Sequence, residues 1–349
     1  MAGPRVFLKG TTAWPAQAEN LPVASIVKMY EQGFAGAYGE PEEKARFRAE
    51  QPQPFGEAIA HASGFAESGA GKLVIPFIYH QQTFPNCWPA AAQDRGDCVS
   101  HSTRNALLLT LICEIMAGQP DEVSGVIEGV PEISPEAIKE GVLSTEAIYW
   151  WRRHGGDGWS CDAAASVAVK ESGMWLRKNY ADLGVDLTTY SGSKAGLYGR
   201  STPPATFAAE GQNHLVRNVT ELKSFEEARD FLHNGYGVST CGGEGFSSER
   251  NEDGVSKRKG GWSHALAYLG ADDRDTTKQK YGEPLVLVQN SWAVWNGGPR
   301  RIMGTEFDIP EGSFWARWSD VKNRDMHAFS SANGWPAREL PDYGATGRI

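Results

Sequence analysis

The sequence lacks any apolar run that could cross a bilayer. Its longest apolar stretch, residues 106–112, falls far short of the roughly 20 residues that a transmembrane helix requires. The N-terminal residues also contain no apolar segment of signal-peptide length. We therefore expect no membrane partner and no export, and a location in the cytoplasm or within an assembled particle.

Concentrated positive charge is also absent. The chain has 34 Lys and Arg against 43 Asp and Glu, a formal net charge of −9, and its densest basic run is residues 256–259. Because phosphate backbones are bound by clusters of positive charge, we expect no nucleic-acid partner.

Metal and nucleotide motifs are missing as well. The eight histidines include no HExxH pair and no close His/Cys cluster with the spacing of a zinc site. Residues 69–72, Gly-Ala-Gly-Lys, are too short to form a phosphate-binding GxxxxGK[ST] loop. We expect neither a metal ion nor a cofactor.

Cysteine is scarce. The five cysteines stand at positions 87, 98, 113, 161 and 241, and none forms a CxxC pair. An odd number means that at least one thiol is free or paired between chains. So low a density in a large chain does not indicate a disulfide scaffold. We expect Cys113 and Cys161 to be small buried apolar residues and Cys241 to be a structural residue of a strand.

Large aromatic residues and glycine are plentiful, with 12 Trp and 40 Gly among 349 residues. Tryptophan side chains need a packed interior, so the composition excludes a largely disordered chain. Residues 1–75 are an extension rich in Gly, Pro and Ala, with a charged, exposed helix expected at residues 41–48. Residues 74–79 indicate a strand or an extended arm.

The clearest helical pattern covers residues 98–116, which contain no Gly or Pro. Apolar residues recur there at helical spacing, which predicts a mostly buried helix with Cys98 in its first turn, after a cap at Asp97 or a neighbouring residue. Further helices are predicted from Ser134, Ser144, Ser160 and Ser224, and strands at residues 236–241, 264–269, 285–290 and 313–318. Helices first and strands later favour an α+β protein with two lobes that divide near residues 191–211.

Three segments together indicate a catalytic site: Gln93-Asp-Arg-Gly-Asp-Cys98 at a helix start, Trp262-Ser-His264 entering a strand, and Gln289-Asn-Ser-Trp292 leaving one. In this order of Cys, His and Asn, the chain resembles the papain-like cysteine peptidases. Residues 142–146, 154–164 and 290–295 resemble the "LSEQ", "GG…A" and "NSWGxxW" segments of that family. The resemblance covers about residues 76–335.

The resemblance implies an α+β papain-like fold of two lobes. A helical lobe, residues 76–200, would carry the cysteine, and a β-barrel-like lobe, residues 201–335, would carry the histidine and asparagine. Residues 1–75 have no counterpart in the family, and residues 336–349 would form a C-terminal tail.

The family pattern assigns each residue a role. Cys98 would be the nucleophile, activated by His264 and by the helix N-terminus, and Asn290 would orient the imidazole. Gln93 and the backbone N–H of Cys98 would stabilise the oxyanion. Trp292 would cover the His–Asn hydrogen bond and exclude water from it. A glycine pair, Gly155 and Gly156, would let an extended polypeptide substrate pair with the backbone of the cleft.

The sequence also departs from the family pattern. Val99 stands where the family usually has Trp, Ala293 replaces the Gly of NSWG, and Gln93 is one residue closer to the cysteine than usual. Arg95 replaces a family cysteine, so the usual disulfide is missing, which agrees with a reducing compartment. The carboxylates of two neighbouring residues, Asp94 and Asp97, would disfavour a thiolate at Cys98. We expect His101, three residues after the nucleophile, to be a surface histidine.

Three functions fit these observations. The first is a cysteine peptidase that hydrolyses peptide or isopeptide bonds through a thioester acyl-enzyme. The second is a catalytically idle papain-like scaffold in a larger assembly, such as a virus particle, whose terminal extensions bind protein partners. The third, a cell-wall amidase with a Cys-His site, shares the nucleophile but not the Asn-Ser-Trp segment.

Overall fold

The computed structural model describes residues 21–38, 41–50, 65–83, 92–117, 141–331, 334–338 and 340–346. The helix predicted from Ser134 and the thiol of Cys87 lie outside these ranges. Within them, no helix is long and apolar enough to cross a membrane.

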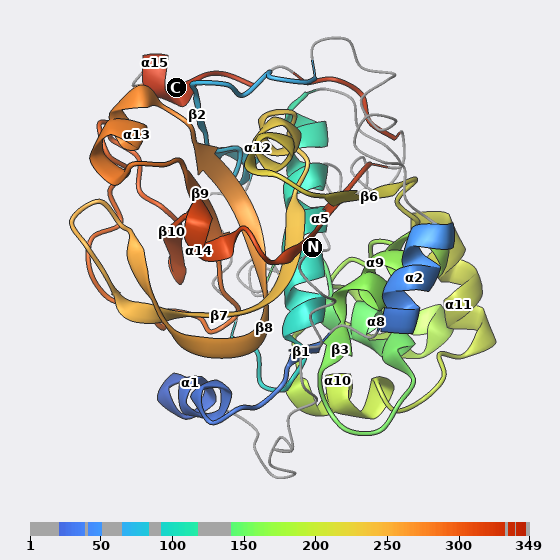
Figure 1. Cartoon of the computed structure of the whole chain (residues 1–349). Helices are drawn as coiled ribbons and strands as arrows, with labels where there is room; N and C mark the ends of the chain where they lie inside the picture. The colour runs from blue at the N-terminus through green and yellow to red at the C-terminus, as the bar shows by residue number, and fades with distance from the viewer. Residues whose placement is uncertain are drawn as a thin grey trace.

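A central helix, α5 (Cys98–Met116), separates the helical side of the molecule from the sheet (Figure 1). Its bounds agree with those predicted from the sequence. Every residue from Cys98 to Ile115 is buried, because α5 contacts β7 and β8 on one side and helices α8 and α9 on the other. A helix enclosed in this way positions its first residue, Cys98, inside the protein.

Among the described residues 141–214, the helical side contains four short α-helices and three 3-10 turns. They are α8 (Thr145–Tyr149), η1 (Trp150–Arg152), α9 (Cys161–Lys170), η2 (Ala181–Leu183), α10 (Gly192–Tyr198), α11 (Ala205–Gly211) and η3 (Gln212–His214). Three of them begin at serines whose side chains accept a hydrogen bond from the backbone N–H three residues later: Ser144, Ser160 and Ser191. Such caps satisfy N–H groups that a helix end leaves unpaired, so these serines set where the helices begin.

The other side is a seven-stranded antiparallel sheet in the order β10-β9-β8-β7-β11-β6, with β2 also paired to β8. Its strands are β2 (Leu73–Val74), β6 (Val219–Leu222), β7 (Val238–Arg250), β8 (Ser256–Asp272), β9 (Leu285–Gln289), β10 (Ser313–Arg317) and β11 (Asp325–Phe329). The long strands β7 and β8 curve strongly, as Figure 1 shows. The prediction of an α+β protein with a helical side and a β-rich side is confirmed.

Helices also flank the sheet. They are α12 (Phe225–His233), α13 (Asp275–Tyr281), α14 (Trp318–Val321) and α15 (Tyr343–Thr346). The helix predicted from Ser224 is α12, and Ser224 accepts a hydrogen bond from the Glu227 N–H at its start.

The N-terminal residues pack against both sides of the molecule. They form α1 (Val23–Glu31), β1 (Ala37–Tyr38), α2 (Pro41–Glu50) and α4 (Ile78–Thr83). β1 pairs in parallel with β3 (Trp159–Ser160). The prediction of a strand or extended arm at residues 74–79 is wrong beyond Val74, because the chain turns there and continues as α4.

Candidate active site

Cys98 lies at the first position of α5, where unpaired backbone N–H groups and the helix dipole favour a negative charge. The preceding residue, Asp97, is the N-cap, but its side chain makes no capping hydrogen bond. The Cys98 side chain is completely buried. The helix start therefore favours a thiolate, whereas the missing solvent disfavours one.

His264 and Asn290 come together because they lie on neighbouring strands. His264 is part of β8, and Asn290 follows β9 directly. Nε2 of His264 donates a hydrogen bond to Oδ1 of Asn290 over 2.8 Å, and the N–H of Ser291 donates to the same oxygen. Nδ1 of His264 has no hydrogen-bond partner among the described residues. The arrangement fixes one tautomer and leaves the other ring nitrogen available as a base.

Trp292 stacks on the His264 ring, with ring centroids 4.6 Å apart and planes 26° apart. Trp262 approaches Trp292 edge-on at 4.8 Å. Both tryptophans are buried, so water is excluded around the His–Asn hydrogen bond, where a hydrogen bond is stronger than in water.

A residue of the N-terminal extension, Tyr30, completes the surroundings of the nucleophile. Its ring lies edge-on to His264 at 4.5 Å, and its hydroxyl hydrogen-bonds the sulfur of Cys98. Tyr30 is itself wholly buried. The sequence offered no local signal for this residue, because it lies far from Cys98 in the chain and in a segment without a family counterpart.

Gln93 lies beside the nucleophile, but its amide is already bonded. Nε2 donates to the Tyr30 hydroxyl (3.1 Å) and to the carbonyl of Arg95 (2.5 Å), while Oε1 accepts from the Ser291 hydroxyl. An oxyanion would therefore have to displace Tyr30 or the Arg95 carbonyl to reach the Gln93 amide.

Burial sets the protonation states of the pair. The pKa of Cys98 is raised to about 12, mainly by loss of solvent; the Tyr30 hydrogen bond opposes the shift, and the Asp97 carboxylate contributes to it. Loss of solvent lowers the pKa of His264 to about 3, although the hydrogen bond that its ring N–H donates to Asn290 opposes the shift. Thiol and imidazole are therefore both neutral in this closed form.

The backbone of residues 35–38 crosses directly over the nucleophile. Gly36 donates its N–H to the Ser263 carbonyl (2.9 Å) and accepts from the Trp159 N–H (3.0 Å). A Cβ at Gly36 would lie 2.8 Å from Cys98 Sγ and would overlap the Tyr30 hydroxyl. Only glycine fits this approach.

The predicted glycine pair lies at the edge of this crossing. Gly155 and Gly156 are exposed, and nothing lies within 4 Å of a Cβ added at either. The glycine that meets the crossing backbone is Gly158, whose φ is +82° and whose added Cβ would overlap the carbonyl of Ala35. The hydroxyl of Tyr38 lies 2.9 Å from Nε2 of His154, next to the pair.

An ion pair ties the nucleophile's loop to the facing loop. Nε of Arg95 donates to Oδ1 of Asp157 over 2.8 Å, and the two side chains are 12% and 5% exposed. The carbonyl of Gly96 accepts from the Gly158 N–H and the Tyr149 hydroxyl. A charged pair therefore holds these two loops together.

A disulfide joins Cys161 and Cys241, with Cα atoms 6.1 Å apart. It connects the start of α9 to β7. The prediction that Cys161 is simply a small apolar residue is therefore wrong, and the bond also weakens the argument for a reducing compartment, because disulfides persist under oxidising conditions. The free cysteines of the described ranges are Cys98 and Cys113, both buried.

The prediction that His101 is a surface histidine is also wrong. His101 is 1% exposed rather than on the surface, because every face of this part of α5 is covered. Its Nε2 lies 3.6 Å from Oδ2 of Asp97, and the Tyr190 hydroxyl donates to that same carboxylate oxygen.

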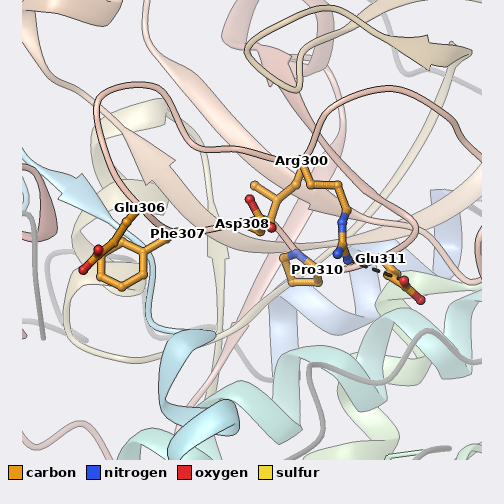
Figure 2. Close-up of a pocket in the computed structure, with 7 residues that line it drawn as sticks. Arg300, Glu306, Phe307, Asp308, Pro310 and Glu311 are labelled. Atoms are coloured by element: carbon orange, nitrogen blue, oxygen red, sulfur yellow. Dashed lines mark ion pairs between the residues drawn. The ribbon is translucent and has the colours of Figure 1, made fainter.

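Among the described residues, no group of three or more His, Cys, Asp or Glu side chains could hold a metal ion. A cavity of about 330 Å³ is lined by Arg300 and residues 306–311, with an Arg300–Glu311 ion pair of 3.6 Å at its rim (Figure 2). None of the candidate catalytic residues lines this cavity.

No family model and no curated protein sequence matches the chain. Solved structures do resemble it. Xylellain, a cysteine protease from Xylella fastidiosa, is 15% identical, with a TM-score of 0.42 over 70% of this chain and 84% of that one. A procathepsin B from Trypanosoma congolense is 13% identical, with a TM-score of 0.47 over 93% and 92%. The cysteine protease and lectin-like domains of Cwp84 from Clostridium difficile are 18% identical, with a TM-score of 0.40 over 72% and 50%.

The described structure has a cysteine at a helix start, a histidine on β8 and an asparagine directly after β9. In this order the three residues resemble those of the papain-like cysteine peptidases. Likeness at these identities and TM-scores says nothing about activity, so the function is argued from the geometry of this chain alone.

Proposed function

We propose that the chain is a papain-like cysteine peptidase whose substrate is an extended polypeptide. The observation that carries the proposal is the His264–Asn290 hydrogen bond. It leaves Nδ1 of this buried imidazole without a hydrogen-bond partner among the described residues. A histidine held only for packing gains nothing from a fixed tautomer with one bare nitrogen, because an unpaired buried polar atom is unfavourable.

In the proposed reaction, Cys98 gives its proton to Nδ1 of His264 and its sulfur attacks the scissile carbonyl carbon. The backbone N–H of Cys98 and the Gln93 amide stabilise the oxyanion. The C–N bond then breaks, and His264 donates the proton to the leaving amine. Water attacks the thioester with His264 as base, which releases the carboxylic acid and restores the thiol.

The described form would be a resting form of this peptidase. Residues 35–38 occupy the backbone edge at Trp159 that an extended substrate would use. Tyr30 covers Cys98 and His264 at the same time. Displacing this segment would admit water and substrate, and would move both pKa values back toward their ordinary range.

A second candidate function is the idle scaffold. The closed site and the pKa of about 12 at Cys98 favour it, because a neutral, covered thiol performs no chemistry. Under that proposal, the helical lobe (76–200), the β-rich lobe (201–335) and the terminal extensions would act as a binding component in an assembly.

The deciding experiment is labelling with an epoxysuccinyl inhibitor at neutral pH, read by intact mass and peptide mapping, before and after limited proteolysis of residues 21–38. We expect slow labelling of the closed form and rapid single labelling at Cys98 after cleavage. His264→Ala should abolish the rapid phase, and Cys98→Ala should fold normally but remain unlabelled. Labelling that stays slow after cleavage would contradict the peptidase and favour the scaffold.

A further inference from the structure

Arg324, Gly242 and His264 lie side by side across the sheet, on or next to three neighbouring strands. On β7, Gly242 pairs with His264 of β8, and the register shifts directly after this pair. On the other side of β7, Cys241 pairs with Asp325, the first residue of β11. Arg324 immediately precedes β11, so its side chain starts two strands away from His264.

The Arg324 side chain crosses that distance over Gly242. Its Nη2 donates to the backbone carbonyl of His264 over 2.6 Å. A Cβ at Gly242 would lie 2.7 Å from Cγ and 2.8 Å from Nη1 of Arg324, so the path exists only because position 242 is glycine. The Arg324 side chain is 0% exposed.

The guanidinium is fixed at its other nitrogens. Nε donates to the Thr240 hydroxyl over 3.0 Å, and Nη1 donates to Oε2 of Glu244 over 3.3 Å. The Thr240 hydroxyl in turn donates to the carbonyl of Leu266, two residues along β8 from His264. A planar, forked donor reaches these three acceptors from three different nitrogens, whereas a lysine carries all of its donors on one nitrogen.

We propose that Arg324, braced by Glu244, is a positioning residue that holds His264 in register for the reaction. This inference rests on the proposed function. Arg324 touches neither the imidazole nor the nucleophile, and it acts through the backbone of His264. Arg324 and Glu244 are both buried and paired with each other. Their contact therefore also holds the positive charge of the guanidinium close to the imidazole.

The positive charge of Arg324 affects the pKa of His264 in a defined direction. Arg324 is one of the groups that lower the pKa of His264, after burial, and it acts together with His101. Among the described residues, the titratable and charged groups that face or act on the ring are Tyr30 from α1, His101 from α5, and Arg324, which is paired with Glu244 of β7. Cys98, at the start of α5, is linked to the ring through Tyr30. Removing the guanidinium should therefore raise the pKa of His264.

The test compares Arg324→Lys and Arg324→Met in the full-length chain, with Arg177→Lys as a matched control. Arg177 is likewise 0% exposed and paired with a buried carboxylate, that of Glu146 at 3.2 Å. Histidine ring-nitrogen NMR reports the tautomer and pKa of His264, assigned by loss of its signals in His264→Gln. Turnover of fluorescent casein after cleavage of residues 21–38 gives kcat and KM.

We expect Arg324→Met to raise the pKa of His264 and to weaken its single tautomer. Arg324→Lys should retain more of the charge effect but lower kcat about 10- to 100-fold at nearly constant KM, since small displacements of a catalytic group have effects of that size. Arg177→Lys should change neither measurement.

An unchanged tautomer, pKa and kcat in both Arg324 variants would overturn the inference. If Arg324→Met does not fold, Arg324→Lys and Glu244→Gln decide by the same measurements. If wild-type protein shows no turnover, the proposed function fails, and the NMR comparison still decides the role of Arg324.

Discussion

The hydroxyl of Tyr30 hydrogen-bonds the sulfur of Cys98, and the same ring packs edge-on against His264. One side chain from the N-terminal extension therefore contacts both partners of the candidate catalytic pair. It also receives a hydrogen bond from Gln93, so it engages the residue proposed for the oxyanion as well. The extension is thereby part of the site's structure and not only an appendage to it.

Replacing this side chain should open the site. Tyr30→Ala removes a fully buried ring, and aromatic-to-alanine changes in cores cost about 3–5 kcal/mol. If about a third of that loss, roughly 1–1.7 kcal/mol, destabilises the closed position of the segment, labelling of Cys98 by iodoacetamide rises about 5- to 17-fold. Tyr281→Ala, on α13, is the control. Equal labelling rates in wild type, Tyr30→Ala and the control would show that Tyr30 does not keep the thiol covered.

Gly36 provides an independent test of the same closure. Gly36→Ala places a methyl group 2.8 Å from Cys98 Sγ, and backbone in that position has no room to accept it. We expect the segment to shift away, Cys98 to become accessible to iodoacetamide, and the main unfolding transition to change little. Gly297→Ala is the control, because its added Cβ would meet only the end of the Glu249 side chain, at 3.3 Å. A labelling rate that matches the control would be evidence against direct contact between this backbone and the nucleophile.

The sequence predicts the helix and strands that carry the candidate site better than it predicts the contacts that cover the site. Helix α5 was predictable from its composition, because an uninterrupted run of helix-forming residues with an apolar period has one favourable conformation. The strand that contains His264 and the strand that ends just before Asn290 followed from a period of two or another strand-like pattern. These signals are local, and the structure reproduces them.

The contacts that close the site are not local. No sequence pattern links Tyr30 or Gly36 to Cys98, because their approach depends on how the whole extension packs. The Cys161–Cys241 bond was missed for a related reason, since cysteine positions alone do not define connectivity. One sequence signal was available for the ion pair between the two loops. Arg95 and Asp157 carry opposite charges, and Arg95 replaces the family's cysteine.

The disulfide should be detectable by thiol counting. Iodoacetamide under denaturing conditions should label two more cysteines after reduction than before, and peptide mapping should assign them to Cys161 and Cys241. The double variant Cys161→Ser/Cys241→Ser should lose about 2–5 kcal/mol of unfolding free energy, measured by urea denaturation. Cys113→Ser is the control, because Cys113 is buried but unbonded. Equal label numbers with and without reductant would refute the bond.

The docking of α2 should depend on pH through Glu221. Burial raises the pKa of Glu221, but hydrogen bonds from Arg48 and Lys223 outweigh burial and lower it from 4.5 to about 2. Arg48 binds both carboxylate oxygens, at 2.8 and 2.7 Å. A carboxylate whose pKa is lowered by folding stabilises the native state above its unfolded pKa, and this stabilisation is lost as the pH falls through the folded value. The relevant window is therefore about pH 4.5 down to about 2.

Hydrogen exchange of the α2 amides across that window tests the assignment. We expect protection to be constant above pH 5 and to fall below it, after correction for intrinsic exchange rates. The loss should correspond to about 1–2 kcal/mol, because Arg48 is half-exposed and solvent screens the pair. Glu221→Gln should remove most of the pH dependence, whereas Glu171→Gln, in an exposed pair with Arg153, should leave it intact. If α2 protection in Glu221→Gln still falls with pH as in wild type, another carboxylate, such as Asp325 beside Lys44, holds the helix in place.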